Sequence, residues 1–263
     1  MAGAWRDLRT RRLSARPTTH RGGVVTERTP DGVTQSPKGA RPPQPTPRRT
    51  ALGHAVADRT RLLQRLSNEN VPSAVATLAV LRRAVGAEPG ADPQVWSDTL
   101  GLVPDSAFDP RSDEPSAAEL AAHHAMTLFA LHRQGRVEGA HVDGTAPGIA
   151  FARAAWARRG PDGESEGVRR RFDAMVTAPT SAESAGHLRG LVQLLRAEDI
   201  GLDYGLLAED LADLWSVHGQ NRTRLRWARQ YRAAAGFGEI TLPGSTATGE
   251  DTPTALSTTA TKE

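Results

Sequence analysis

The sequence predicts an all-α protein, and three observations support this. Apolar residues recur at helical spacing in almost every segment between about residues 51 and 237. No segment shows a run of four or more residues with the alternation of a strand. Helix-start signals precede several of the periodic segments. We therefore expect a compact bundle of about eight or nine helices, with a division into two lobes near the loop 101–115 as an alternative.

Composition predicts the domain boundaries. Residues 1–50 hold seven prolines and eleven Lys or Arg against three acids, with almost no aliphatic periodicity. Such a segment cannot bury enough surface to offset its chain entropy. Residues 238–263 are rich in Thr and Ser, which predicts the same behaviour. The folded domain is therefore expected at 51–237, between a disordered basic tail and a disordered C-terminal tail.

The excess of basic residues lies outside the predicted domain. The whole chain has a formal net charge of +3, but residues 51–237 carry 21 arginines against 23 acids. A nucleic-acid surface on the domain therefore requires arginines gathered on one face. The absence of cysteine excludes disulfides, thiolate metal sites and cysteine nucleophiles. With no apolar run long enough for a membrane span and no secretory signal, we expect a cytoplasmic protein without membrane contact.

Apolar stripes and caps predict the helices of the first half. The stripes consist of Leu52, Val56, Leu63 and Leu66 in the first helix, and of Val75, Leu78 and Val85 in the second. Asp92 and Pro93 predict a short third helix, because Asp can cap it and Pro fits its first position. The capping box from Ser116 to Glu119 predicts the start of a long helix that ends before Gly135.

The second half follows the same rules. Helices are expected at about 147–158 and 165–178, and Thr180 and Asp203 are expected to cap the next two. The apolar stripes of the last three of these helices are Val168, Phe172, Met175 and Val176; Leu188, Leu191, Val192 and Leu195; and Leu206, Leu207, Leu211 and Trp215. Arg189, Gln193 and Arg196 form a polar stripe that faces away from the core.

The run 221–232 is the most informative segment for function. It places five arginines around a Trp and a Tyr and contains no acid. Wound as a helix, it puts Arg222, Arg226 and Arg229 on one face and Trp227, Ala228, Tyr231 and Ala235 on the opposite one. Guanidinium groups suit a row of phosphates, because they donate in bidentate geometry and stay charged. The alternative is an amphipathic helix whose arginines pair with acids elsewhere in the fold.

Further arginines occupy unusual places. Arg59 lies within the apolar stripe of the first helix, a costly position unless an internal acid, the bundle end or a groove compensates it. The pair Arg82-Arg83 and the run 169–171 direct guanidinium groups outward. The candidate nucleic-acid-binding residues are Arg59, Arg82, Arg83, Arg169, Arg170, Arg189, Arg196, Arg222, Arg224, Arg226 and Arg229.

The possible enzyme motifs in the sequence lack the structural context that their chemistry requires. The segment 163–167 matches the nucleophile pattern G-x-S-x-G around Ser165, but a turn into a helix precedes it where the elbow needs a strand. His123 and His124 are adjacent on a helix and point about 100° apart, and His132 lies two turns beyond His124, so no metal pair results. His124 falls in an apolar stripe and is expected to be a core histidine. We expect no catalytic residue, metal or cofactor.

Four segments carry a family resemblance. Residues 125–134, 168–177, 187–196 and 222–231 resemble, in order and spacing, the CasB family, the small subunits of the type I-E CRISPR Cascade complex. The resemblance covers about residues 51–235, and the last two segments are its most specific part.

The resemblance implies an all-helical, non-catalytic protein present in two copies in a surveillance ribonucleoprotein. It implies as partners the other Cascade subunits, CRISPR RNA, both strands of the target DNA and a second copy of the chain. Its arginines would contact the target and displaced strands without sequence preference and stabilise the R-loop. The alternatives are a free-standing helix-turn-helix regulator, with the arginine helix in the major groove, and a helical enzyme, for which no acid/base or metal set is visible.

Overall fold

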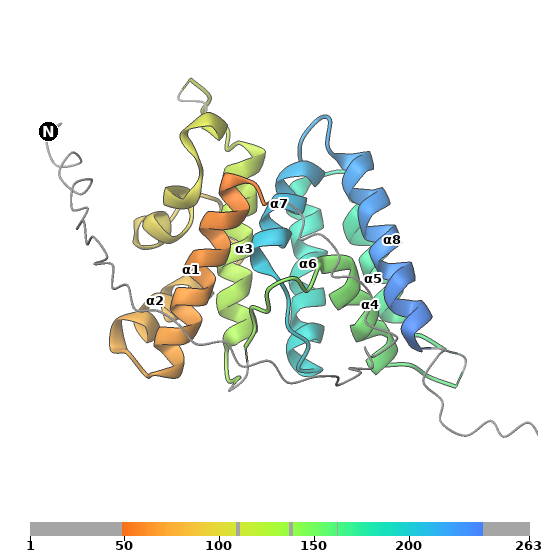
Figure 1. Ribbon diagram of the computed structural model, residues 1–263. Helices are drawn as coiled ribbons and strands as arrows, with labels where there is room; N and C mark the ends of the chain where they lie inside the picture. The colour runs from red at the N-terminus through yellow and green to blue at the C-terminus, as the bar shows by residue number, and fades with distance from the viewer. Residues whose placement is uncertain (1–48, 109–110, 137–138, 162, 239–263) are drawn as a thin grey trace, which may run out of the picture. The chain divides into compact units, whose positions relative to one another are not determined.

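The computed structural model describes residues 49–108, 111–136, 139–161 and 163–238, with side chains up to 235. Within these ranges it contains eight α-helices, three 3-10 helices and no strand, which confirms the predicted fold class (Figure 1). Apart from residues 49, 50 and 238, the predicted tails lie outside the described residues. No described helix has the length and apolar character that crossing a membrane requires.

The helices keep close to the predicted bounds. The α-helices are α1 (Ala51–Asn68), α2 (Pro72–Arg83), α3 (Ala117–Arg133), α4 (Pro147–Ala157), α5 (Glu166–Thr177), α6 (Ser181–Ala197), α7 (Tyr204–Leu214) and α8 (Gln220–Gly238). The 3-10 helices are η1 (Pro93–Asp98), η2 (Leu100–Leu102) and η3 (Asp105–Ala107).

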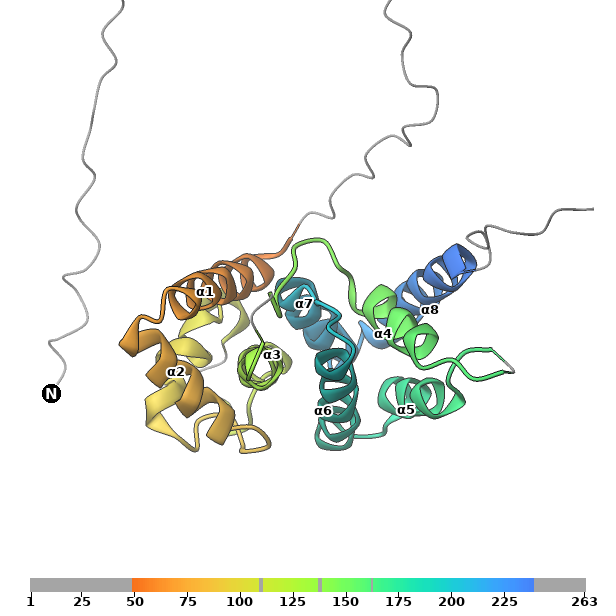
Figure 2. The ribbon, with the colours of Figure 1, turned by 90° about the horizontal axis from the view of Figure 1, so that it is seen from below.

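One hydrophobic core joins these helices. In Figures 1 and 2, α3, α6 and α7 stand in the middle, with α1 and α2 on one side of them and α4, α5 and α8 on the other. The main packing pairs are α4 with α8, α3 with α7, and α1 with α7. All described residues belong to one compact unit with one core cluster, and they show no division into two lobes at the loop 101–115.

Predicted caps fix four of the helix starts. The Asp92 side chain accepts a hydrogen bond from the Gln94 backbone N–H at 2.9 Å, and Asp203 accepts one from Leu206 at 3.1 Å. Ser116 and Glu119 form the complete capping box of α3. Thr180 accepts from the Glu183 backbone at 3.2 Å and starts α6. Each cap satisfies a backbone donor that the first turn of its helix leaves free.

Most predicted core positions are buried, with corrections in α2 and α7. The stripe of α6 is fully buried, and Leu52, Val56 and Leu63 of α1 are buried as well. Val75 was expected in the core of α2 but is 47% exposed; the neighbouring helices cover the face of Ala74, Leu78 and Leu81 instead. Val85 and Trp215 are half-buried and lie just past the ends of α2 and α7, where the backbone has already left the helix.

Helix α8 is held against α4 by a close backbone contact. A Cβ atom at Gly148 would lie 2.7 Å from the Trp227 carbonyl oxygen, which is shorter than a carbon–oxygen contact tolerates. The Gly148 backbone N–H also donates to the Gln230 side chain at 3.1 Å. The packed face of α8 consists of Thr223, Trp227 and Tyr231, which lie four residues apart. This contact fixes which face of the arginine helix points outward.

Candidate nucleic-acid interface

Arg59 fills a structural role. Its Nε atom lies 2.5 Å from Asp98 Oδ1, and Asp98 is buried at the end of η1. The pair ties α1 to η1, and each partner offsets the desolvation of the other. Of the alternatives for Arg59, pairing with an internal acid is the one found, so its assignment to nucleic acid is not supported.

The arginines in the first half of α8 are also engaged within the fold. Arg222 Nη2 lies 3.0 Å from Asp213 Oδ1. Arg226 Nη2 bonds Asp210 and lies 3.5 Å from Asp213 Oδ2. The Arg224 Nε–H donates to the Val176 carbonyl oxygen at 2.7 Å. The alternative in which arginines of the run pair with acids elsewhere in the fold therefore holds for Arg222 and Arg226.

Asp210 is the buried anchor between α7 and α8. Its two carboxylate oxygens accept hydrogen bonds from Arg226 and from the indole N–H of Trp227. Burial raises the pKa of Asp210 to about 6, although Arg226 and the Trp227 bond act in the opposite direction. The carboxylate is charged at neutral pH, so removal of Arg226 would leave it unpaired in the interior.

On α5, the two predicted arginines lie in exposed ion pairs. Arg169 Nε contacts Asp173 at 3.1 Å, and its guanidinium carbon lies 4.9 Å from the centre of the Tyr231 ring. Arg170 pairs with Glu166 one turn earlier. Pairs of this kind contribute roughly 0–1 kcal/mol in water, so a phosphate could compete for these arginines.

A different group of arginines has no acid partner among the described residues. Its predicted members are Arg82 and Arg83 at the end of α2, Arg189 on α6, and Arg224 and Arg229 on α8, of which Arg224 bonds only a backbone carbonyl. Arg196 on α6 bonds only the neutral Gln134 side chain, at 3.4 Å. These guanidinium groups can take a phosphate without breaking an ion pair.

Three arginines converge along α6. Arg189 and Arg196 lie on its outward stripe, as predicted, with Arg189 exposed and Arg196 half-buried. Arg171 reaches over from α5, and its Cδ atom lies 3.0 Å from the position of a Cβ at Gly190. The sequence prediction named Arg169 and Arg170 but left out Arg171, whereas Arg171 is the member of that run without an acid partner. The weaker signal that could have found it is the absence of an acid four residues before or after it.

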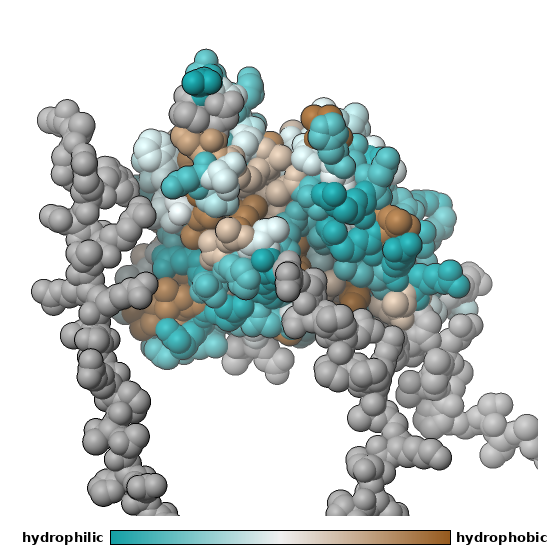
Figure 3. All heavy atoms as spheres, turned by 45° about the horizontal axis from the view of Figure 1, so that its top comes forward, coloured by the Kyte–Doolittle hydropathy of each residue, from teal (hydrophilic) through white to brown (hydrophobic). Residues whose placement is uncertain are grey.

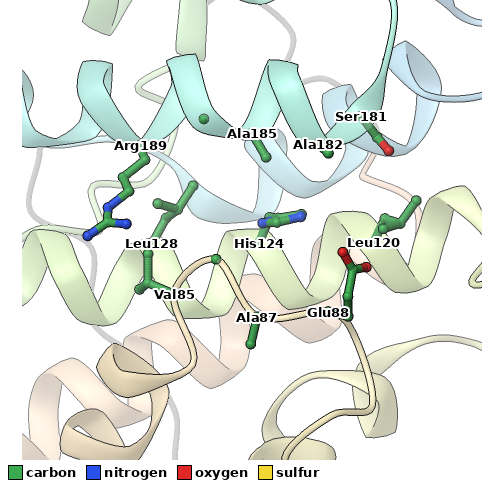
Figure 4. A pocket seen from close by; sticks show the side chains of 12 residues that line it. Val85, Ala87, Glu88, Leu120, His124, Leu128, Ser181, Ala182, Ala185 and Arg189 are labelled. Carbon is green, nitrogen blue, oxygen red and sulfur yellow. The ribbon is translucent and has the colours of Figure 1, made fainter.

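A groove runs beside this row of arginines. It encloses about 170 Å³ between the loop after α2 and the first half of α6, with α3 as its floor (Figure 4). Its walls carry small residues, among them Gly86, Ala87 and Ala185, while Arg189 stands at one end and Glu88 lies towards the other (Figure 4). Small walls and an exposed cation suit a narrow charged chain such as a nucleic-acid backbone.

His124 lies on the floor of this groove and is half-buried, not enclosed as a core histidine would be. Its ring packs edge-on against Trp215, with centroids 5.4 Å apart. Burial, together with a smaller effect of His123, lowers the pKa of His124 to about 4, so the ring is neutral at physiological pH. His124 therefore offers shape and hydrogen bonding to the groove, and Arg189 provides its positive charge.

The surface over α7 and α8 is mostly hydrophilic on the face shown in Figure 3. Arg229 and Arg232 of α8 are exposed, without an acid partner among the described residues. Arg224 bonds only a backbone carbonyl, so three of the five arginines in the run have no acid partner among the described residues.

The geometry settles the role of two further sites, of which the sequence indicated only the first. Ser165 is the residue before α5, and a turn closed by hydrogen bonds between Gly160 and Gly163 precedes it, so no strand positions it as a nucleophile. No pattern in the sequence predicted the cluster of His141, Asp143 and Asp203, whose ligand atoms lie within 4.8 Å of one another.

Arginine side chains bond the two acids of that cluster. Arg49 bonds both Asp143 and Asp203, and Arg61 Nε lies 2.8 Å from Asp143. The bond from Arg61 lowers the pKa of Asp143 to about 2. We interpret the cluster as an ion-pair hub that joins α1, the loop before α4 and the start of α7.

The sequence matches the family model of the CRISPR-associated protein Cse2 over residues 77–231. The crystal structure of CasB from Thermobifida fusca is 35% identical over 70% of this chain and 98% of that chain, with a TM-score of 0.56. A chain of a CRISPR RNA-guided surveillance complex is 20% identical over 72% of this chain and 97% of that chain, with a TM-score of 0.54, which shows a shared fold. No curated protein matches the sequence.

Proposed function

Since the chain belongs to the Cse2 (CasB) family, the non-catalytic small subunit of the type I-E Cascade complex, we propose that it holds opened DNA along the α6 groove. It is a member of a surveillance complex with other subunits and CRISPR RNA. In the proposed function it contacts the target and displaced strands without sequence preference, stabilises the R-loop and acts together with a second copy of itself.

The observation that carries this proposal is the row of available arginines on α6. Arg189 and Arg196 lie on α6 and Arg171 reaches over it from α5, and none of the three has an acid partner among the described residues. The groove beside Arg189 has small walls that let a backbone come close. Arg82 and Arg83 end α2 only three residues before Gly86 of the opposite wall, which extends the same positive field.

A few such contacts are enough to affect R-loop formation. The heteroduplex that forms is about as stable as the DNA duplex it replaces, so the exchange is nearly balanced. Each phosphate contact adds a favourable and salt-dependent term. Because guide pairing reads the sequence, the subunit needs only charge and shape.

The test is the double variant Arg189→Gln/Arg196→Gln in a reconstituted complex. We expect the affinity for matched duplex DNA to fall about tenfold, and the slope of log K against log salt to become shallower by about two. Gel filtration of the complex would verify that the subunit is still incorporated.

A matched control removes two charges that are already paired. Arg158 lies 2.7 Å from Glu198 and Arg61 lies 2.8 Å from Asp143, and neither is a candidate nucleic-acid-binding residue. The variant Arg158→Gln/Arg61→Gln should change the affinity less than twofold, within the range expected for exposed pairs. Equal losses in both double variants would show that net charge alone matters and would contradict a site on α6.

On α8, Arg229 is the appropriate probe among the predicted residues. A triple replacement of Arg222, Arg226 and Arg229 would also strip the partner from buried Asp210 and so mix folding with binding. Arg229→Gln alone leaves those pairs intact, and we expect it to weaken DNA binding less than the α6 variant does.

The helix-turn-helix regulator is the less favoured alternative. It needs α8 to enter a major groove with its arginines directed at base edges. Arg222 and Arg226 instead face α7 acids, and the family match supports a Cascade subunit.

A further inference from the structure

A second groove lies between α5 and α8 and has no part in the proposed function. It encloses about 670 Å³, and its apolar lining includes Trp156, Phe172, Val176 and Ala228. Ala228 was predicted to face the core but is exposed, because α5 stands off from α8 at this point. The groove is thus an apolar surface that the described residues leave uncovered.

The lining residues of α8 form one stripe that points to its C-terminal end. They include Arg224, Ala228, Tyr231 and Ala235, which are separated by four, three and four residues. With 3.6 residues per turn, the stripe continues at residues 238–239. The chain therefore leaves α8 on the side of the groove.

The segment that follows has a pattern suited to this groove. Residues 239–243 read Glu-Ile-Thr-Leu-Pro, so in an extended conformation Ile240 and Leu242 project to the same side. The stripe from Arg224 to Ala235 spans about 16 Å at 1.5 Å per helical residue. About five extended residues at 3.3 Å each cover that length. Gly238 supplies the backbone freedom for the chain to turn back.

Charge favours the same occupant. Residues 239–263 carry four acids and one lysine. Two acids of the groove, Glu164 and Asp173, are paired with Arg169. Its other cations are Arg232, which is exposed without an acid partner among the described residues, and Arg224, which gives only its Nε–H to a backbone carbonyl. An acidic segment that starts beside these cations is attracted to them.

We propose that the groove between α5 and α8 is the docking site of the chain's own segment 239–243, with Ile240 and Leu242 against the apolar lining. In this arrangement the segment acts as a strap that fixes the C-terminal half of α8 to α5. It also covers Ala228 and places Glu239 near Arg232.

Disulfide trapping tests this directly, because the chain has no cysteine of its own. The pair Ala228→Cys/Leu242→Cys in the full-length protein should form an intramolecular disulfide under mild oxidation. The control pair Arg229→Cys/Leu242→Cys has nearly the same sequence separation, but Arg229 does not line the groove. We expect the first pair to close about tenfold faster, since docking raises the effective concentration of the two thiols.

A third variant checks the role of the apolar contacts. Adding Ile240→Asp to the first pair should reduce its closure rate to that of the control. Equal rates for the two pairs would overturn the proposal, and so would a preference that survives Ile240→Asp. Disulfide-linked dimers as the main product would assign the groove to the segment of a second copy and would also overturn the intramolecular contact.

Discussion

Helices α6 and α8 both carry arginines, but the arginines of the two helices have different neighbours. The run at 221–232 has five arginines within twelve residues, whereas α6 has only two. Yet Arg222 and Arg226 face acids of α7, while Arg189 and Arg196 of α6 face none. Both arginines of α6 therefore lack an acid partner among the described residues, whereas two of the five arginines in the run of α8 are paired with acids.

The difference comes from what each helix packs against. Helix α7 presents Asp210 and Asp213 on one side, one turn apart, and α8 folds back onto them through a short connection. Across the groove, the outward stripe of α6 faces the loop after α2, where Gly86 lies nearest to Arg189 and the one acid, Glu88, forms no ion pair with it. The charge available to a ligand depends on tertiary neighbours, which a local count of arginines does not include.

The largest expected effect concerns the close contact between α4 and α8. Gly148→Ala should lower the free energy of unfolding by about 3 kcal/mol, because the added methyl meets the Trp227 backbone and cannot be accommodated by a rotamer change. On α6, Gly186 has open space around its Cβ position. Gly186→Ala should therefore stabilise the protein by about 0.5–1 kcal/mol. Urea unfolding followed by circular dichroism measures both, and equal destabilisation would refute the close contact at Gly148.

The next effect is a pH dependence from Asp210. Its pKa is about 6 in the folded state against an ordinary value of 3.8, so the folded state binds the extra proton between these values. This carboxyl therefore favours folding below about pH 4, and its contribution falls as pH rises towards 6. The difference in unfolding free energy between the wild type and Asp210→Asn should fall by about 2 kcal/mol from pH 4 to pH 7.

Thr223→Ala is the control for that titration, because Thr223 is buried in the same contact, bonds Arg226 and carries no ionisable group. Its difference from the wild type should not show the same fall between pH 4 and pH 7. A flat curve for Asp210→Asn would mean that Asp210 is not the titrating group in the α7–α8 contact.

The smallest effect is expected when an acid partner of the α8 arginines is removed, which makes α8 more like α6. Asp213→Ala should release Arg222 fully and Arg226 in part, and raise the affinity for single-stranded DNA about fivefold at low salt. Glu69→Ala makes the same change in net charge at an exposed acid without an ion pair to a described residue. Fluorescence anisotropy with a labelled oligonucleotide compares the two, and an equal gain from Glu69→Ala would assign the effect to net charge alone.

Local signals predicted the fold well. The caps at Asp92, Ser116, Thr180 and Asp203 depend on residues within one turn of each other, and all four form as expected. The error at Val75 has a different origin, because helical spacing fits two faces of α2 and only the positions of α1 and α3 decide which one is covered.

The site was less predictable because it depends on distant partners. Arg59 meets Asp98, 39 residues away, and Arg226 meets Asp210, 16 residues away. Sequence spacing identifies ion pairs at three or four residues on one helix, such as Arg170 with Glu166. It gives no means to pair residues across helices, so it could name the arginines but not separate the engaged ones from the available ones.

The ion-pair hub around Asp203 sets the shortest fragment that can be expected to fold like the full chain. Arg49 bonds two of its acids, Thr50 caps α1, and the Thr50 backbone N–H bonds Glu209. A truncation that begins at Ala51 would remove all of these bonds, although it keeps every residue of the helix. A truncation that begins at Thr46 would retain them, so the two fragments should differ in melting temperature.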